Sequence, residues 1–324
     1  MNKQISRPNI KNSTILVTGG AGFIGSHLVD RLINQGANQI IIIDNLFNGN
    51  EDNLKEAISK GVIFYKDDTE FSSSLDYIFE KHNIDIVFNC ATKALNHSFV
   101  NPKNSFDTNV HSILNLLEHQ RKGSFKTLAH FSTSEVYGTA VYEPMDESHP
   151  TNPTTAYAAG KAAADIALRS WVNMFNNDAF IFRPFNNYGS RQNYKGYLAG
   201  IIPITASRIK KGIPPEIYGT GQQTRDFIFV EDTIDAIIKL YPLIKPAESI
   251  NISTGGQISM LDVIHKISSL MNYQGEILYK PSRNADVETH NSNNEKMKSM
   301  IDCQFTNFDS GLAKTIKWYQ ENLN

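Results

Sequence analysis

The sequence has few cysteines, little net charge and no long apolar run, and each of these absences excludes a class of protein. Its 324 residues include two cysteines, Cys90 and Cys303, which lie far apart and outside any Cys-x-x-Cys pattern. We therefore expect neither a disulfide framework nor a structural zinc site, and a reducing cytoplasm fits this usage. No apolar stretch approaches the ~18 residues that span a bilayer, and residues 1–11 are polar, unlike a secretory signal.

Positive and negative charges nearly cancel. Lys and Arg number 31 and Asp and Glu 33, which gives a formal net charge of -2. No field of one sign would hold such a chain on nucleic acid or on an anionic membrane, so we expect neither partner. Hydrophobic residues make up 40% of the chain and charged residues 20%, an ordinary composition for a globular protein with a large core. We therefore expect a globular cytoplasmic protein without a metal site.

Short apolar runs alternate with segments of helical length through the first half of the chain. Each run is apolar at consecutive positions and does not alternate with polar residues, as expected for parallel strands that helices cover on both faces. They occupy residues 14–18, 39–43, 62–65, 84–88, 127–131 and 179–183. The pattern predicts an α/β fold built on a parallel sheet.

The second half is less regular. After Pro184 the sequence becomes rich in Gly, Pro, Asn and Tyr, and irregular sequence after a sheet often contacts substrate. We expect a cofactor-binding domain over residues 1–186 with a returning segment around 224–254. A smaller, interleaved C-terminal substrate-binding region would then comprise residues 187–223 and 255–324.

A glycine-rich turn joins the first predicted strand to the first predicted helix. Gly19, Gly22 and Gly25 have the spacing that allows a tight turn, close approach of a pyrophosphate, and close packing of helix on strand. The helix N-terminus then offers N–H groups and positive partial charge to the phosphates. Asp44 ends the second strand, where a carboxylate binds a ribose 2′-hydroxyl and repels a 2′-phosphate, and no Arg occupies residues 45–50. The sequence therefore predicts a Rossmann-type doubly wound sheet that binds NAD in preference to NADP.

A tyrosine and a lysine stand four residues apart on one face of a predicted helix. These are Tyr157 and Lys161, and a nearby ammonium favours a phenolate and lowers the tyrosine pKa from about 10. Such a tyrosine can act as a base near neutral pH. Residues 131–138, FSTSEVYG, follow a buried strand and bring hydroxyls and a carboxylate to the carboxyl end of the sheet, where open α/β sheets bind ligands.

Together these motifs resemble the extended short-chain dehydrogenase/reductase family, in its nucleotide-sugar-modifying branch. The resemblance covers nearly the whole chain and rests on TGGAGFIG, DNL, STSEVYG, YAAGK, RPFN and QTRDF. It implies a homodimer, built from the helices around residues 108–120 and 155–171. It also implies a nucleotide-diphosphate sugar as substrate, most commonly a UDP-sugar. The NAD contacts that it implies are Gly19, Gly22, Phe23, Ile24, Gly25, Asp44, Asn45, Asp68, Lys93, Tyr157 and Lys161.

The resemblance also implies one chemical step. Tyr157 takes the proton of the sugar 4-hydroxyl while the C4 hydride passes to NAD, Lys161 positions the cofactor ribose, and Thr133 hydrogen-bonds the reacting hydroxyl. His290 falls near the position that limits the room for the C2 substituent of the sugar. The substrate contacts implied are Ser98, Thr133, Asn186, Arg225, Arg283 and Asp286.

The fate of the resulting 4-keto sugar stays open among epimerisation, 4,6-dehydration and decarboxylation of a uronic acid. Glu135 stands where dehydratases carry their C5 base, but Ser134 replaces the aspartate with which dTDP-glucose dehydratases protonate the leaving hydroxyl. UDP-glucuronate decarboxylases use an arginine near residues 288–294, and the sequence ETHNSNN contains none. We therefore expect a 4-epimerase, with dehydratase and decarboxylase as alternatives. A non-catalytic NAD-binding protein is a remote alternative, because fold alone does not prove activity.

Overall fold

The main element of the protein is a parallel sheet, seen in a computed structural model that describes residues 7–282 and 289–323. Within these residues the sheet has seven strands in the order β11-β6-β5-β4-β1-β2-β3. Their bounds, in that order, are Ser249–Ile252, Asp178–Pro184, Thr127–Phe131, Ile86–Asn89, Thr14–Thr18, Gln39–Ile43 and Ile63–Tyr65. The strand order reverses between β1 and β4, so the expected doubly wound α/β fold is confirmed.

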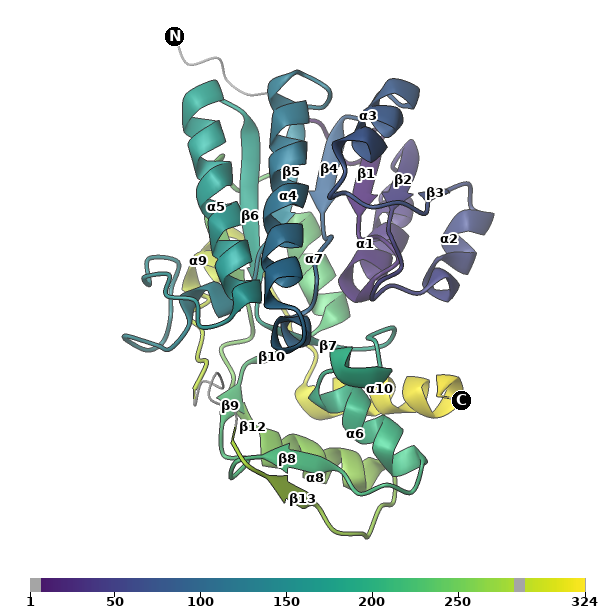
Figure 1. Cartoon of the computed structure of the whole chain (residues 1–324), viewed down its shortest axis with the longest axis vertical. Coiled ribbons are helices and arrows are strands. Elements are labelled where there is room, and N and C mark those ends of the chain that lie inside the picture. Colours follow the sequence, from purple (N-terminus) through teal and green to yellow (C-terminus); the bar gives the residue numbers. More distant parts are fainter. Residues whose placement is uncertain (1–6, 283–288, 324) are drawn as a thin grey trace.

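Helices cover both faces of this sheet (Figure 1). The buried strands are apolar at consecutive positions because alternate side chains point to opposite layers. Ile15 and Val17 of β1 pack in the core that contains α1 and α7, whereas Leu16 packs in the core of α3, α4 and α5. The helices of the first layer are α1 (Phe23–Asn34), α2 (Lys55–Ser59), α7 (Val230–Leu240) and α9 (Glu295–Met300), and those of the second are α3 (Ser72–Lys81), α4 (Pro102–Arg121) and α5 (Ala156–Phe175).

Helix α5 begins at a fixed position because the Thr155 side chain accepts a hydrogen bond from the backbone N–H of Ala158. Gly160 lets α4 approach closely, since a Cβ at this position would lie 2.9 Å from the carbonyl oxygen of Phe106. These two contacts fix where α5 begins and how it packs on α4. They therefore also fix the positions of the predicted catalytic tyrosine and lysine.

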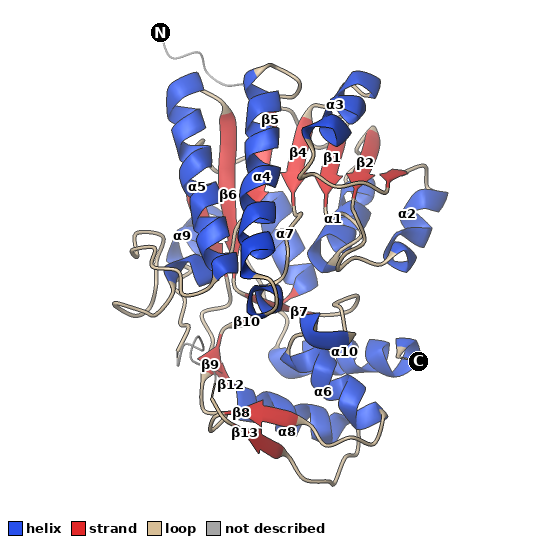
Figure 2. Ribbon diagram, in the orientation of Figure 1, coloured by secondary structure: helices blue, strands red, loops and turns tan. Residues whose placement is uncertain are grey.

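A smaller region packs below the carboxyl ends of the strands (Figure 2). It has its own apolar core, formed mainly by three helices and the aromatic strands beside them. The helices are α6 (Ile201–Lys210), α8 (Met260–Leu270) and α10 (Phe308–Asn322). Short strands pair there as β7 (Asn186–Tyr188) with β10 (Phe227–Phe229), β8 (Glu216–Tyr218) with β13 (Leu278–Lys280), and β9 (Thr224–Arg225) with β12 (Ile258–Ser259).

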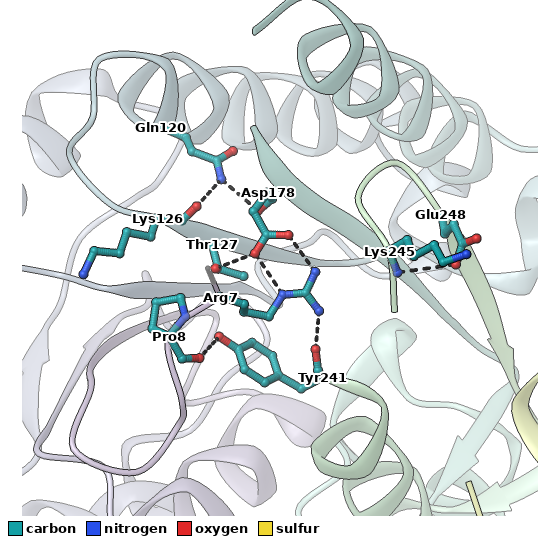
Figure 3. Close-up of polar contacts among 9 residues, drawn as sticks. All are labelled: Arg7, Pro8, Gln120, Lys126, Thr127, Asp178, Tyr241, Lys245 and Glu248. Carbon is teal, nitrogen blue, oxygen red and sulfur yellow. Dashed lines mark hydrogen bonds and ion pairs between the residues drawn. The ribbon is translucent and has the colours of Figure 1, made fainter. Parts of the chain in front are cut away.

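The start of the described chain is fastened to the amino ends of β5 and β6 (Figure 3). The Arg7 guanidinium donates to both carboxylate oxygens of Asp178, at 2.8 and 2.6 Å, and also to the carbonyl of Tyr241. The Thr127 hydroxyl donates to the same carboxylate at 2.7 Å. Asp178 is 3% exposed, and an unpaired carboxylate so deep would cost several kcal/mol, so Arg7 compensates a buried charge.

None of the helices in residues 7–282 and 289–323 is long and apolar enough to cross a membrane.

Candidate active site

A cavity of about 440 Å³ opens at the carboxyl ends of the parallel strands, beside β1 and β4, where the strand order reverses. Ligands of open α/β sheets bind at this place. The turn after β1, the loops after β2, β4 and β5, and the start of α5 form one side, and residues of the smaller region form the other. Most of the predicted site residues line it: Gly19, Gly22, Phe23, Ile24, Gly25, Asp44, Asn45, Asp68, Lys93, Thr133, Glu135, Tyr157, Lys161, Asn186 and Arg225.

The turn after β1 accepts only glycine at two positions. Gly19 has φ +66°, and a Cβ there would lie 2.8 Å from the Cα of Ala91. A Cβ at Gly25 would lie 2.2 Å from the carbonyl oxygen of Gly19. The bare backbone leaves room for a pyrophosphate at the N-terminus of α1, so the residues present fit a dinucleotide.

Asp44 lies at the end of β2 and closes the ribose end of this cradle. Its carboxylate accepts N–H bonds from Ala21 at 3.0 Å and from Leu46 at 2.8 Å, which leaves lone pairs on both oxygens for ribose hydroxyls. Burial raises its pKa above the ordinary value, while these hydrogen bonds oppose the shift. Asn45 donates to Asp68 at 2.6 Å and joins the second and third strand loops.

The phenol of Tyr157 lies among polar groups from three elements. The side chains of Thr133, after β5, and Thr92, after β4, lie near it, and both lower its pKa. Burial outweighs them, and with the negative charge of Glu135 it raises the pKa of Tyr157 to about 12. The sequence expectation of a lowered tyrosine pKa is therefore wrong for the protein's own groups. Thr92 was missed as a site residue, and its position directly after a buried strand was the available signal.

Lys161 is bound to the end of β5. Its ammonium donates to the carbonyl of Phe131 at 2.7 Å, and the residue is 2% exposed. Burial lowers its pKa to about 8. The lysine therefore lines the cavity, and none of the hydrogen bonds of the described residues joins it to Tyr157.

Lys93 and Ser98, in the loop after β4, both contact other side chains of the protein. The Lys93 ammonium lies 3.8 Å from the centre of the Phe47 ring, which itself borders the cavity. The Ser98 hydroxyl accepts a hydrogen bond from the backbone N–H of Tyr157 at 2.8 Å and also bonds Ser105. Ser98 thus supports the first turn of α5 from below, and its contact with substrate stays a prediction.

The substrate side is described in part. Asn186 donates to the Asp226 carbonyl through its backbone at 3.1 Å and its side chain at 3.4 Å, which places it beside Arg225 on the cavity wall. His290 is fully buried, with its ring 5.3 Å from that of Phe185. The predicted contacts Arg283 and Asp286 lie outside the described residues.

Among the residues described, no group of three or more His, Cys, Asp and Glu side chains could hold a metal ion.

Residues 15–253 match the model of the NAD dependent epimerase/dehydratase family. The chain belongs to this family. NAD is accordingly its cofactor, and the glycine turn with Asp44 is where this family member can hold it.

Relatives within the epimerase/dehydratase family have two activities. The human dTDP-D-glucose 4,6-dehydratase is 30% identical over 96% of this chain and 91% of its own length. The solved UDP-glucose 4-epimerase of Thermotoga maritima, with UDP-glucose, is 30% identical, with a TM-score of 0.89 over 96% of this chain and all of that one. The dTDP-glucose 4,6-dehydratase of Bacillus anthracis, solved with NAD, is 28% identical, with a TM-score of 0.85 over 96% and 97%. The chain is therefore similar to NAD-dependent nucleotide-sugar enzymes of both kinds.

Proposed function

We propose that the protein is an NAD-dependent nucleotide-sugar 4-epimerase. The observation that carries the proposal is the meeting of Tyr157, Thr133 and Lys161 in one cavity with the glycine turn. Asn186 and Arg225 border the same cavity from the smaller region. A nucleotide sugar can therefore place its C4 carbon by the tyrosine and its diphosphate by the amide and guanidinium.

The chain's own groups move one proton. Tyr157 accepts the proton of the sugar 4-hydroxyl, and the Thr133 hydroxyl donates a hydrogen bond to the phenolate that must form first. Bound NAD supplies the hydride acceptor for C4 and a positive ring charge that favours the phenolate. Lys161 holds the ribose and adds a second positive charge. In the 4-keto sugar C4 is planar, so a sugar that turns over regains hydride on its other face and the proton from Tyr157.

We assign NAD to residues 1–186 with the returning segment 224–254, and the substrate to residues 187–223 and 255–324. Asn186 and Arg225 lie at the borders of the first set and face the substrate. A UDP-sugar is the favoured substrate, since the similar epimerase of Thermotoga maritima was solved with UDP-glucose. A cytoplasmic location is part of the proposal and is supported by the free thiols of Cys90 and Cys303.

We further propose that the protein is a homodimer in which α4 and α5 face a second copy. These helices pack on each other, yet apolar side chains on their outer surfaces face solvent. Ile166 and Met174 of α5 are 62% and 66% exposed, and Phe106 of α4 is 38% exposed. Isologous pairing of two helices from each copy would cover these side chains.

A second candidate reaction is 4,6-dehydration, and Glu135 is the observation that favours it. The carboxylate borders the cavity near enough to Tyr157 to raise the tyrosine pKa. Among the hydrogen bonds of the described residues, none goes to the Glu135 side chain, so it has no structural partner there. It is therefore placed to take a C5 proton from a 4-keto sugar. Ser134, a weak acid, stands next to it where a proton donor to the leaving hydroxyl would be needed.

Product mass distinguishes the two reactions. The protein with NAD is incubated with UDP-, GDP- and dTDP-sugars, and the products are analysed by mass spectrometry and sugar chromatography. We expect one nucleotide sugar to become an isomer of equal mass. Rapid loss of the mass of water or carbon dioxide, with no isomer from any sugar tested, would contradict the epimerase proposal.

A further inference from the structure

A buried carboxylate lies one helical turn beyond the lysine of the site. Asp165 follows Lys161 by four residues on α5 and is 1% exposed. Its Oδ2 accepts two hydrogen bonds from the guanidinium of Arg183 on β6, at 3.1 and 2.8 Å. Its Oδ1 has no hydrogen-bond partner among the described residues. Arg183 therefore fixes the carboxylate through Oδ2, and Oδ1 stays without a hydrogen bond.

The neighbour on β5 is a neutral histidine. The Oδ1 of Asn89 accepts the Thr18 hydroxyl at 2.6 Å, so its Nδ2 donates to Nδ1 of His130 at 3.1 Å. The ring proton of His130 is then on Nε2, which lies 3.9 Å from Oδ1 of Asp165. Burial and the charge of Lys161 both hold the pKa of His130 well below its ordinary value, so the ring carries no charge.

The other groups around Lys161 are also uncharged. The Phe131 carbonyl accepts a hydrogen bond from the ammonium, and burial raises the pKa of the Cys90 thiol, after β4, above the ordinary value. Asp165 and Cys90 are the groups whose negative charge would raise the pKa of Lys161. Since the thiol stays neutral near pH 7, Asp165 is the negative charge that acts on Lys161 among the described residues.

We propose that Asp165, fixed by Arg183, is a positioning residue that keeps the buried Lys161 ammonium charged and able to hold the cofactor ribose. The inference rests on the proposed role of Lys161 in the C4 oxidation. Burial alone would drive the lysine toward its neutral form, and a neutral amine is a weaker donor that no longer favours the phenolate of Tyr157.

The test is the pH dependence of NAD binding, measured by calorimetry on the intact protein without any sugar. Wild-type affinity should fall above about pH 8, where Lys161 loses its proton. Asp165→Asn keeps the shape of the side chain but removes its charge, so the midpoint of this fall should move down by about one pH unit. An unchanged midpoint would overturn the inference.

Tyr137→Phe is the matched control. The Tyr137 hydroxyl accepts from Arg183 at 3.0 Å and donates to Asn251 at 2.7 Å, so its loss damages the same buried network while the charge of Asp165 stays. We expect lower thermal stability and an unmoved midpoint, whereas an equal shift would overturn the inference. If Asp165→Asn does not fold, the double variant Asp165→Asn/Arg183→Gln also removes the guanidinium that would otherwise stay buried without its carboxylate. Its midpoint should also move down, and an unmoved midpoint would count against the inference. Absence of NAD binding at every pH would refute the proposed function instead.

Discussion

At the scale of single residues, the environment of the tyrosine decides the chemistry. Thr133 and Thr92 lower the pKa of Tyr157, but burial and Glu135 outweigh them and raise it to about 12. The fold thus provides a well-placed phenol that the protein alone keeps protonated. Positive charge brought by the bound cofactor is required before it can act as a base.

Glu135→Gln separates the two candidate reactions at the same scale. For a 4-epimerase, we expect isomerisation within about tenfold of wild type, because the amide keeps the size of the side chain and no proton is taken from C5. Rates are measured from the products of the active nucleotide sugar. Glu143→Gln, on an exposed loop, is the control and should change nothing. A loss of roughly 10²-fold or more that is specific to Glu135→Gln would contradict the 4-epimerase account.

The sequence predicted some of these residues and not others, for physical reasons. Gly19 and Gly25 were predictable because backbone conformation and close contacts leave no alternative to glycine. The tyrosine pKa was not, because it depends on burial by residues distant in sequence. Ser98 was placed in the correct loop, but its bond to the backbone of Tyr157 depends on how that loop meets α5.

At the scale of elements, six of the seven strands described in the main sheet were predicted within two residues, and the edge strand β11 was not. Their continuous apolar sequences are characteristic of a sheet buried on both faces. The short pairs in the smaller region were not predicted. Thr224 and Arg225, for example, pair with Ile258 and Ser259, and a two-residue strand leaves no periodic pattern.

The exposed apolar side chains on the outer faces of α4 and α5 predict a dimer. We expect light scattering to give twice the mass of the 36.3 kDa chain. Ile166→Glu should yield the monomer, because a charge in the centre of an apolar interface is left unpaired. Ile213→Glu is the control, since Ile213 is also exposed, at 42%, but lies outside both helices. A monomeric wild-type protein, or equal effects of the two variants, would contradict the proposed dimer.

At the scale of the whole molecule, function depends on the meeting of two regions. The carboxyl ends of the sheet provide the glycine turn and Tyr157, and the smaller region provides Asn186 and Arg225 across one cavity. The resemblance to the family predicted that Asn186 and Arg225 contact the substrate, and residue identity alone did not. The fate of the ketone was not predictable, because the same cavity presents both Tyr157 and the carboxylate of Glu135.

Oxidation at C4 is the central claim, and the absorption band of NADH tests it most directly. The protein loaded with NAD is mixed rapidly with the nucleotide sugar that it converts. We predict a transient rise of this band in the wild-type protein. Tyr157→Phe should still bind NAD yet give no rise and no product. Conversion of the sugar by wild-type protein without any transient NADH, or sustained conversion by Tyr157→Phe, would contradict the account.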